Sequence, residues 1–394
     1  MTREGSKAVP LVAAGIATAF LLSPADGATP PAIIRVSVDS SGAQANGRSD
    51  PYPSISADGR FVAFASVASN LVAGDTNGAS DIFVHGLVSR ETTRVSVDSG
   101  GAQADAVSSR PAVSGDGRFI AFQSAASNLV AGDTNGASDI FVHDRESGET
   151  TRVSVANDGG QANASSFEPG INADGRFVTF FSPASNLVEG DTNNTYDAFV
   201  HDRVSGATIR ASVDSAGVEG NSFSFMTTIS GDGRVVAFES LSSNLVAGDT
   251  NSNFDIFAHD LETGATTRVS VGAGGTQGNN GSHEPTLNAD GRFVAFHSFA
   301  INLIQGDTNG APDVFIHDRA SGTTARLSMS SGGAQANASS FEPAVGGAAR
   351  LLAFRSGASN LVEADTNAAD DIFVVAQRPH LSSTPPEAED RRPR

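Results

Sequence analysis

The 394-residue sequence contains no cysteine. This absence excludes a disulfide framework and a lipid-anchoring thiol, so stability has to come from packing, with bound ions as a further source. Positive charge is also scarce: 25 lysines and arginines stand against 44 aspartates and glutamates, and the formal net charge is −19. Such a surface repels nucleic acid and anionic lipid, and it is compatible with cations, basic proteins or neutral sugars.

Long hydrophobic runs are scarce too. The apolar run 8–22 is too short for a membrane-spanning helix; it follows Arg3 and Lys7 and is bounded by Pro24. This pattern predicts a cleavable signal peptide over residues 1–27, and hence a secreted or periplasmic protein that is not inserted in the membrane after cleavage. Residues 378–394 are rich in proline, serine and charge, which predicts a disordered tail.

Common catalytic motifs are missing as well. The sequence has no Gly-x-Ser-x-Gly elbow, zinc motif or phosphate-binding loop. No residue is therefore marked as catalytic by sequence pattern alone.

What the sequence does contain is a strict internal repeat. The stretch Gly-Asp-Thr-Asn-Gly-Ala-Ser-Asp-Ile-Phe-Val-His-Asp at 132–144 recurs in close copies, and its first aspartate returns every 58 residues. Its six positions are Asp75, Asp133, Asp191, Asp249, Asp307 and Asp365. One supersecondary unit is thus written six times.

Each repeat carries four short apolar runs separated by turn residues. In the second repeat the runs are 111–114, 119–122, 140–142 and 150–155, with a Gly-Asp-Gly-Arg turn after the first. The second run is continuously apolar, which predicts a strand buried on both faces, whereas the fourth alternates as an outer strand does. The pattern predicts four antiparallel strands per repeat.

Six four-stranded units are typical of an all-β, six-bladed β-propeller, with a solenoid as the rival fold. The chain ends favour the propeller. Residues 33–38 have a fourth-strand sequence with no preceding strands, and 371–374 form a third strand with no fourth after it. We therefore predict a propeller over residues 33–377, closed by the N-terminal strand, which completes the last blade and leaves no open edge.

Two segments carry a resemblance to a known family. Ser-Gly-Asp-Gly-Arg-Phe-Ile-Ala-Phe at 114–122 and Asp-Ile-Phe-Val-His-Asp at 139–144 resemble the repeat of TolB-like six-bladed propellers, here of an exported bacterial type, over residues 33–377. The resemblance implies the fold more than an activity, since such propellers serve as periplasmic interaction modules, gating domains of peptidases and sugar-degrading lyases. Two positions depart from the pattern: Ala348-Ala349 replace Asp-Gly, and Thr227 replaces a proline.

The Asp-x-Asn-x-x-x-Asp loop offers two carboxylates and an amide oxygen around a sharp turn, which suits Ca²⁺. It also resembles the later half of the calcium loop of FG-GAP propellers. The alternative is that these side chains form Asx turns without metal. The candidate metal ligands are Asp75, Asn77, Asp81, Asp133, Asn135, Asp139, Asp191, Asn193, Asp197, Asp249, Asn251, Asp255, Asp307, Asn309, Asp313, Asp365, Asn367 and Asp371.

Residues present in every repeat are expected to serve packing. Two phenylalanines per repeat, at the positions of Phe64 and Phe83, predict an inter-blade core, with a ligand-binding aromatic stripe as the alternative. The repeated histidines are His85, His143, His201, His259 and His317. Symmetry places them in separate blades, which favours structural hydrogen bonding over metal binding or catalysis.

Recognition of a specific ligand should instead use residues that differ between repeats. The variable residues ahead of each first strand are expected to rim the central mouth, and Phe225 and Met226 are among them. A second variable position, occupied by His297 in the fifth repeat, lies near the far end of the second strand. The predicted ligand-binding residues are Tyr52, Arg110, Phe167, Glu168, His283, Glu284, Phe341 and Glu342.

Three functions are compatible with these features. The favoured one is a monomeric, non-enzymatic module that binds a protein or glycan of the cell envelope or exterior. The second is a hydrolase or lyase acting on polysaccharide or peptide, with the rim glutamates, His283 or His297 as acid–base groups or metal ligands. The third is a calcium-stabilised surface domain. Carboxylates or a His–Glu pair converging across the mouth would favour the enzyme.

Overall fold

The computed structural model describes residues 33–347 and 351–376. The chain divides into two compact units, Met1–Arg35 and Val36–Arg394. The predicted signal peptide and tail lie outside the described residues. Within the described residues, no helix has the length and hydropathy of a membrane span.

Apart from one 3₁₀ turn, the regular elements of the described residues from Val36 onward are all β-strands. Blade 1 contains β1 (Ser54–Ile55), β2 (Phe61–Ser66), β3 (Asp81–Gly86) and β4 (Thr92–Arg94). Blade 2 contains β5 (Ser108–Val113), β6 (Phe119–Ser124), β7 (Asp139–Asp144) and β8 (Thr150–Arg152). Blade 3 contains β9 (Phe167–Ile171), β10 (Phe177–Ser182), β11 (Asp197–Asp202) and β12 (Ala207–Arg210).

The later blades repeat this order. Blade 4 contains β13 (Ser224–Ile229), β14 (Val235–Ser240), β15 (Asp255–Asp260) and β16 (Thr266–Arg268). Blade 5 contains β17 (Ser282–Leu287), β18 (Phe293–Ser298), β19 (Asp313–Asp318) and β20 (Thr323–Arg326), preceded by the 3₁₀ turn η1 (Ala273–Gly275). Blade 6 contains β21 (Ser340–Val345), β22 (Leu351–Ser356) and β23 (Asp371–Ala376).

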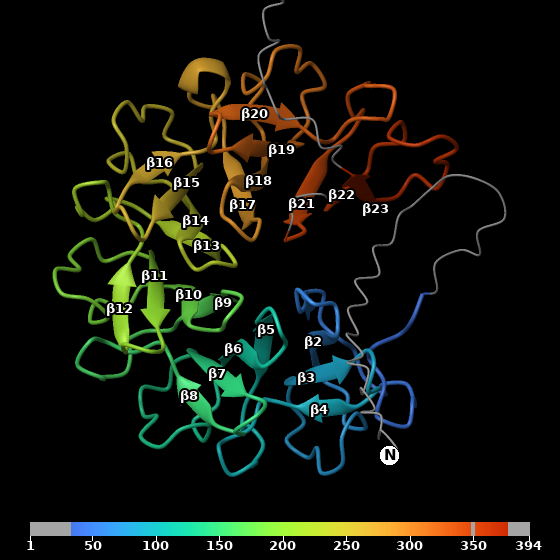
Figure 1. Cartoon of the computed structure of the whole chain (residues 1–394), viewed down its shortest axis with the longest axis vertical. Helices are drawn as coiled ribbons and strands as arrows, with labels where there is room; N and C mark the ends of the chain where they lie inside the picture. Colours follow the sequence, from blue (N-terminus) through green and yellow to red (C-terminus); the bar gives the residue numbers. More distant parts are fainter. Residues whose placement is uncertain (1–32, 348–350, 377–394) are drawn as a thin grey trace, which may run out of the picture. The chain divides into compact units, whose positions relative to one another are not determined.

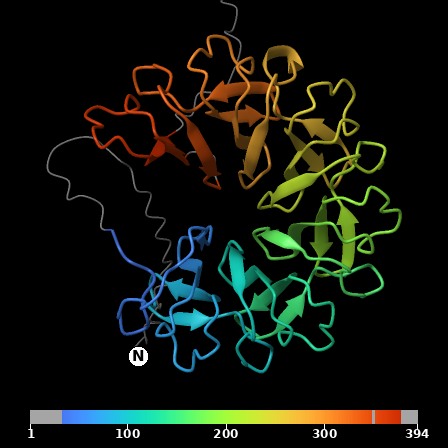
Figure 2. The ribbon, with the colours of Figure 1, turned by 180° about the vertical axis from the view of Figure 1, so that it is seen from behind.

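The six sheets lie around a common centre, with the first strand of each blade innermost (Figures 1 and 2). Every pairing within a blade is antiparallel, as in β6 with β5 and β7. The predicted all-β, six-bladed propeller is confirmed. The fourth strand is shorter than predicted, because the residues after Arg152 cross to the next blade, where the carbonyl of Val155 accepts a hydrogen bond from Thr208 Oγ1 at 2.6 Å.

The repeated phenylalanines form the core, as expected. Phe122 and Phe141 are fully buried and stack with their ring centroids 5.9 Å apart. The same pair recurs in every blade. Each fully buried ring contributes about 2–3 kcal/mol through the area it removes from water, so the repeat is held by residues that cannot vary freely.

The repeated histidines link neighbouring blades. His201 Nδ1 lies 2.9 Å from Thr208 Oγ1, whose proton is donated to the carbonyl of Val155 in the preceding blade. The imidazole therefore donates from Nδ1. Burial lowers the pKa of His201 to about 4, so the ring is neutral at pH 7. The equivalent contact recurs at His85, His143, His259 and His317.

The sixth blade differs from the others at its outer edge. Within the described residues its sheet has three strands, and Ile33–Val36 are not in a strand. Ile372 and Val374 of β23 are 70% and 61% exposed, whereas Ile140 and Val142 of β7 are fully buried. Closure of the ring by the N-terminal strand is not observed and stays a prediction.

Candidate functional site

The innermost strand of five blades carries a β-bulge at one repeat position. In blade 2, Ser109 pairs with Gln123 and Ala112 with Ala121, so Arg110 and Pro111 stand outside the regular register. Arg110 adopts a left-handed backbone with φ of 53°. A bulge of this kind re-aims a side chain, and left-handed non-glycine residues cluster at functional sites. The same conformation recurs at Glu168, Met226, Glu284 and Glu342.

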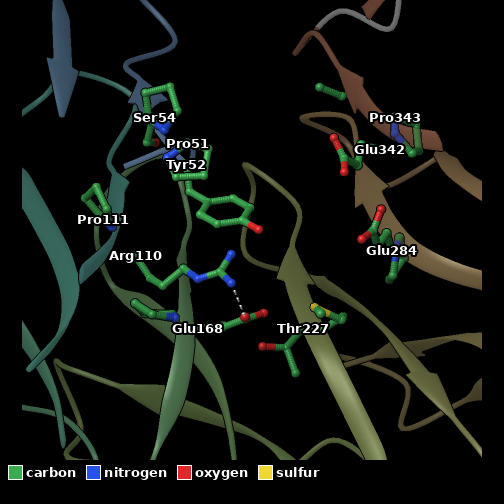
Figure 3. Close-up of a pocket in the computed structure, with 15 residues that line it drawn as sticks. Pro51, Tyr52, Ser54, Arg110, Pro111, Glu168, Thr227, Glu284, Glu342 and Pro343 are labelled. Atoms are coloured by element: carbon green, nitrogen blue, oxygen red, sulfur yellow. Dashed lines mark ion pairs between the residues drawn. The ribbon is translucent and has the colours of Figure 1, made fainter. Parts of the chain in front are cut away.

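The bulge positions converge on the centre of the ring. They line a cavity of about 550 Å³, which we call the mouth, together with Tyr52, which holds the same repeat position in blade 1. Neighbouring prolines and Thr227 complete the lining (Figure 3). The residues at this repeat position, from blade 1 to blade 6, are Tyr52, Arg110, Glu168, Met226, Glu284 and Glu342. Each blade thus presents a side chain of its own.

Five of the eight predicted ligand-binding residues line the mouth: Tyr52, Arg110, Glu168, Glu284 and Glu342. Phe167, His283 and Phe341 do not line it. Met226 also lines the mouth, as expected for a rim residue, although it is not among the predicted ligand-binding residues. Its signal was the constant spacing of 58 residues from Arg110 through Glu168.

One side of the mouth is an ordered cluster of three residues. The guanidinium of Arg110 lies 3.5 Å from the ring centroid of Tyr52, and its Nη2 lies 3.0 Å from Glu168 Oε1 (Figure 3). Burial raises the pKa of Glu168, Arg110 opposes that shift, and the charges of Glu239 and Glu284 add to it. Arg110 therefore already has both an aromatic and an anionic partner.

The opposite side carries carboxylates from blades 4 to 6. Glu284 Oε2 lies 3.4 Å from His297 Nδ1, and His283 Nδ1 lies 3.3 Å from Glu239 Oε2. Contact with the His297 imidazole lowers the pKa of Glu284. Figure 3 shows Glu284 and Glu342 facing the Arg110 cluster across the opening.

The sixth blade adds a second arginine. Arg355 contacts Glu342 at 3.0 Å and Asp370 at 2.5 Å. Around the mouth, five carboxylates (Glu168, Glu239, Glu284, Glu342 and Asp370) thus face two guanidinium groups. The site carries an excess of negative charge.

A continuous row of rings lies beside the mouth, in blades 3 to 6. Successive centroids are 5.2 to 6.4 Å apart, and the row, which we call the aromatic band, ends at Phe341. His283 and His297 form its middle, 5.5 Å apart. Its members are Phe167, Phe181, Tyr196, Phe223, Phe225, Phe254, His283, His297, Phe299 and Phe341. The three predicted ligand residues that miss the mouth belong to this band.

The Asp-x-Asn loops are filled by arginines. In blade 4, Arg268 Nη1 lies 3.5 Å from Asp249 and 3.1 Å from Asp255. The Asn251 amide nitrogen faces Asp255 at 3.3 Å, and its oxygen accepts the backbone N–H of Asn253 at 2.9 Å. Calcium would need that oxygen and the space held by the guanidinium. The arrangement, which recurs in blades 1, 2, 3 and 5, does not fit a calcium site.

Blade 6 keeps the loop without an arginine among the described residues, and Asn367 donates to Asp371 at 2.9 Å. Calcium binding by this loop stays a prediction. A melting temperature that does not change when a chelator is added would exclude it.

Blade 3 holds a denser acidic cluster. One oxygen each of Asp191, Asp197 and Glu219 lies within 4.8 Å of the others. Arg210 contacts all three, at 3.4 Å from Asp191 and 3.7 Å from Asp197. Burial raises the pKa of Asp197 to about 6, against the opposing effects of Ser212 and Arg210. The cationic position is thus taken by a side chain of the protein itself.

No protein-family model matches the sequence, and no curated protein matches it either. Solved structures do match. TolB from Acinetobacter baumannii is 16% identical with a TM-score of 0.42, covering 73% of this chain and 55% of that one. The putative TolB from Agrobacterium tumefaciens is 17% identical with a TM-score of 0.44, covering 72% and 81%.

Other matches include proteins with different activities. The β-propeller domain of the Trilobed protease from Pyrococcus furiosus is 11% identical with a TM-score of 0.50, covering 84% of this chain and 82% of that one. An oligogalacturonate lyase in complex with manganese is 12% identical with a TM-score of 0.45, covering 83% and 89%. At these identities the likeness is one of fold. The expected TolB-like propeller is confirmed at that level, and the matches leave the function open.

Proposed function

We propose that this protein is a non-enzymatic binding or scaffold module that holds a protein or glycan at the mouth of its propeller. The observation that carries the proposal is the convergence of six side chains of four kinds, one from each blade, on a single cavity of about 550 Å³. Residues shared by all blades serve packing, whereas the bulge residues differ and are held in a left-handed backbone. Such a mouth can recognise an asymmetric ligand.

The contacts of the rim carboxylates support binding over catalysis. Glu168 and Glu342 are each paired with an arginine at 3.0 Å, which occupies one side of each carboxylate. The His297–Glu284 pair lies within blade 5, and the His283–Glu239 pair joins neighbouring blades. Neither pair spans the mouth in the way expected of an acid–base pair around a substrate bond.

The two His–Glu contacts nevertheless favour one alternative, a hydrolase or lyase that uses this side of the mouth. Such an enzyme would turn over polysaccharide or peptide, and H283A and H297A would each abolish the turnover. We expect no turnover of either class by the unchanged protein. A measurable rate that both variants remove would support the enzyme.

The proposed localisation rests on the sequence of residues 1–27. We infer that residues 1–27 direct export and that the propeller works as a monomer in the periplasm or outside the cell. Ligands of the cell envelope or exterior are then the ones it can meet.

The binding function is tested by charge-neutralising variants of the mouth. The protein is immobilised and exposed to the envelope fraction of its own cells, beside the variant E168Q/E284Q/E342Q. A control variant, E146Q/E149Q/E262Q, removes the same charge at exposed sites away from the mouth. We expect a captured component that the mouth variant loses at least tenfold and the control retains. Equal capture by all three proteins would contradict the proposal.

A further inference from the structure

We propose that the ligand is a polypeptide segment that seats a lysine or arginine in the mouth and lays neighbouring apolar side chains on the aromatic band. The proposal rests on the proposed binding function and names its ligand class. Two independent features of the structure support it: the charge balance of the mouth and the asymmetric distribution of aromatic rings beside it.

The charge balance calls for a cation. Both guanidinium groups near the mouth are already engaged, Arg110 with Tyr52 and Glu168, and Arg355 with Glu342 and Asp370. The Glu284 and Glu239 carboxylates have only histidines as charged or chargeable partners, at 3.3 to 3.4 Å. Moreover, the buried Oε2 of Glu284 makes no hydrogen bond among the described residues, since its contact with His297 Nδ1 at 3.4 Å is too poorly aligned for one. A bound ammonium or guanidinium would satisfy these carboxylates.

The aromatic band supplies the apolar contact, and only on one side. Phe223 and Phe299 are both 42% exposed, and Ile301, two residues after Phe299, is 53% exposed. Ile301 occupies a repeat position that is serine in the other five blades, namely Ser69, Ser127, Ser185, Ser243 and Ser359. This isoleucine adds to the exposed apolar surface of blade 5.

Blades 1 and 2 have no ring at two band positions, where they carry Pro51 and Ser109, and Ala65 and Gln123. At the repeat positions of Phe223 and Phe299 they expose smaller apolar side chains, Val107 and Val67. The ligand therefore meets a rim that carries aromatic rings over blades 3 to 6 and smaller side chains at the band positions of blades 1 and 2. A peptide with basic and apolar residues next to each other matches both the charge and the asymmetry.

A glycan fits the same features less well. Anionic sugars would be repelled by the five carboxylates, and a neutral sugar would desolvate them without supplying a compensating charge. A basic side chain offers that charge, and a cavity of about 550 Å³ accommodates a few side chains rather than a folded domain. The observations thus favour a protein partner with an extended basic segment.

The test uses a phage-displayed library of random dodecapeptides, selected on the immobilised full chain and on E168Q/E284Q/E342Q. We expect peptides captured by the unchanged protein to be enriched in lysine or arginine beside leucine, isoleucine or aromatic residues. A selected peptide, made synthetically with a fluorophore, should bind at least tenfold more weakly to the mouth variant and to F223S/F299S. The control E146Q/E149Q/E262Q should bind it as the unchanged protein does.

A second measurement changes the peptide and leaves the protein unchanged. Replacing the basic residue of the selected peptide with alanine should weaken binding at least tenfold, and binding should weaken steeply as salt rises. Peptides without basic enrichment, or peptides bound equally by the mouth variant, would overturn the inference. A neutral glycan from an array that binds through the mouth, in place of any peptide, would overturn the inference and leave the proposed function standing. If neither peptide binding nor glycan binding depends on the mouth glutamates, both the proposed function and this inference are refuted.

Discussion

A single arginine from the fourth strand contacts both aspartates of the Asp-x-Asn loop in blades 1 to 5. Arg268 is a typical case, buried between Asp249 and Asp255. A buried ion pair adds little net stability, because its attraction is offset by the cost of removing both charges from water. Removing one partner is strongly destabilising, because the other charge stays buried without a counter-charge.

We therefore predict that R268A lowers the free energy of unfolding by about 3 kcal/mol, because it leaves two buried carboxylates unpaired. Urea denaturation measures the loss. The control is R60A, whose ion pair with Asp58 at 2.6 Å is exposed and should contribute less than about 1 kcal/mol. Equal losses in the two variants would show that the Asp249–Arg268–Asp255 contact is not structural.

The repeated histidines predict a dependence of stability on pH. His201 keeps a folded-state pKa of about 4, below its ordinary value of 6.5. The unfolded chain takes up a proton near pH 6.5 and the folded chain does not, so the stability contributed by neutral His201 is lost as the pH falls from 6.5 toward 4.

The variant H201Q keeps a donor toward Thr208 but has no group that titrates. Between pH 7 and pH 5 the unchanged protein should lose about 2 kcal/mol of stability relative to H201Q. The difference is read from urea denaturation of both proteins at the two pH values. Parallel pH profiles would mean that the imidazole is already solvated in the fold.

At the scale of the element, the loop between the second and third strands depends on a left-handed residue. Five blades place glycine there, and blade 6 places Ala364 with φ of 61°. Gly248 holds the same repeat position with φ of 75°, and a Cβ added to it would meet no atom within 4 Å. The conformation alone therefore decides which residue is tolerated.

We predict that A364G raises the free energy of unfolding by up to about 1 kcal/mol, and that the matched variant G248A lowers it by about 1 kcal/mol. Thermal unfolding of the two variants measures both shifts. Shifts of the same sign would rule out backbone strain as their cause.

Strand order and blade number could be predicted from the sequence because both follow from a repeat that never changes length. Which side chains point into the mouth could not be predicted from the sequence. The bulge that turns Arg110 into the mouth depends on how Ser109 and Ala112 pair with the next strand, and the aromatic band depends on contacts between neighbouring blades. A signal for the arginine in the Asp-x-Asn loop was present, since Arg94, Arg152, Arg210, Arg268 and Arg326 recur every 58 residues.

At the scale of the whole molecule, the remaining question is which segment supplies a fourth strand to blade 6, whose described sheet has three. Arg35 precedes Val-Ser-Val at 36–38 as Arg94 precedes Val-Ser-Val at 95–97 after the fourth strand of blade 1. In blade 1, Val84 pairs with Thr93, and Phe83 pairs with Arg94. The same register applied to blade 6 would place Ile34 opposite Val374 and Arg35 opposite Phe373, within reach of Asp365 and Asp371.

A sequence without cysteine allows a direct test of this closure. We predict that the double variant I34C/V374C forms an intramolecular disulfide on mild oxidation, because directly opposite residues of antiparallel strands lie within disulfide range. The measurement is a mobility shift on non-reducing gels, confirmed by mass spectrometry of the linked peptides. The control pair I34C/V142C targets β7 of blade 2, whose edge is already paired with β8, and should stay reduced. Oxidation of both pairs, or of neither, would mean that the N-terminal strand does not complete blade 6, and the exposed edge of β23 would then be open to another chain.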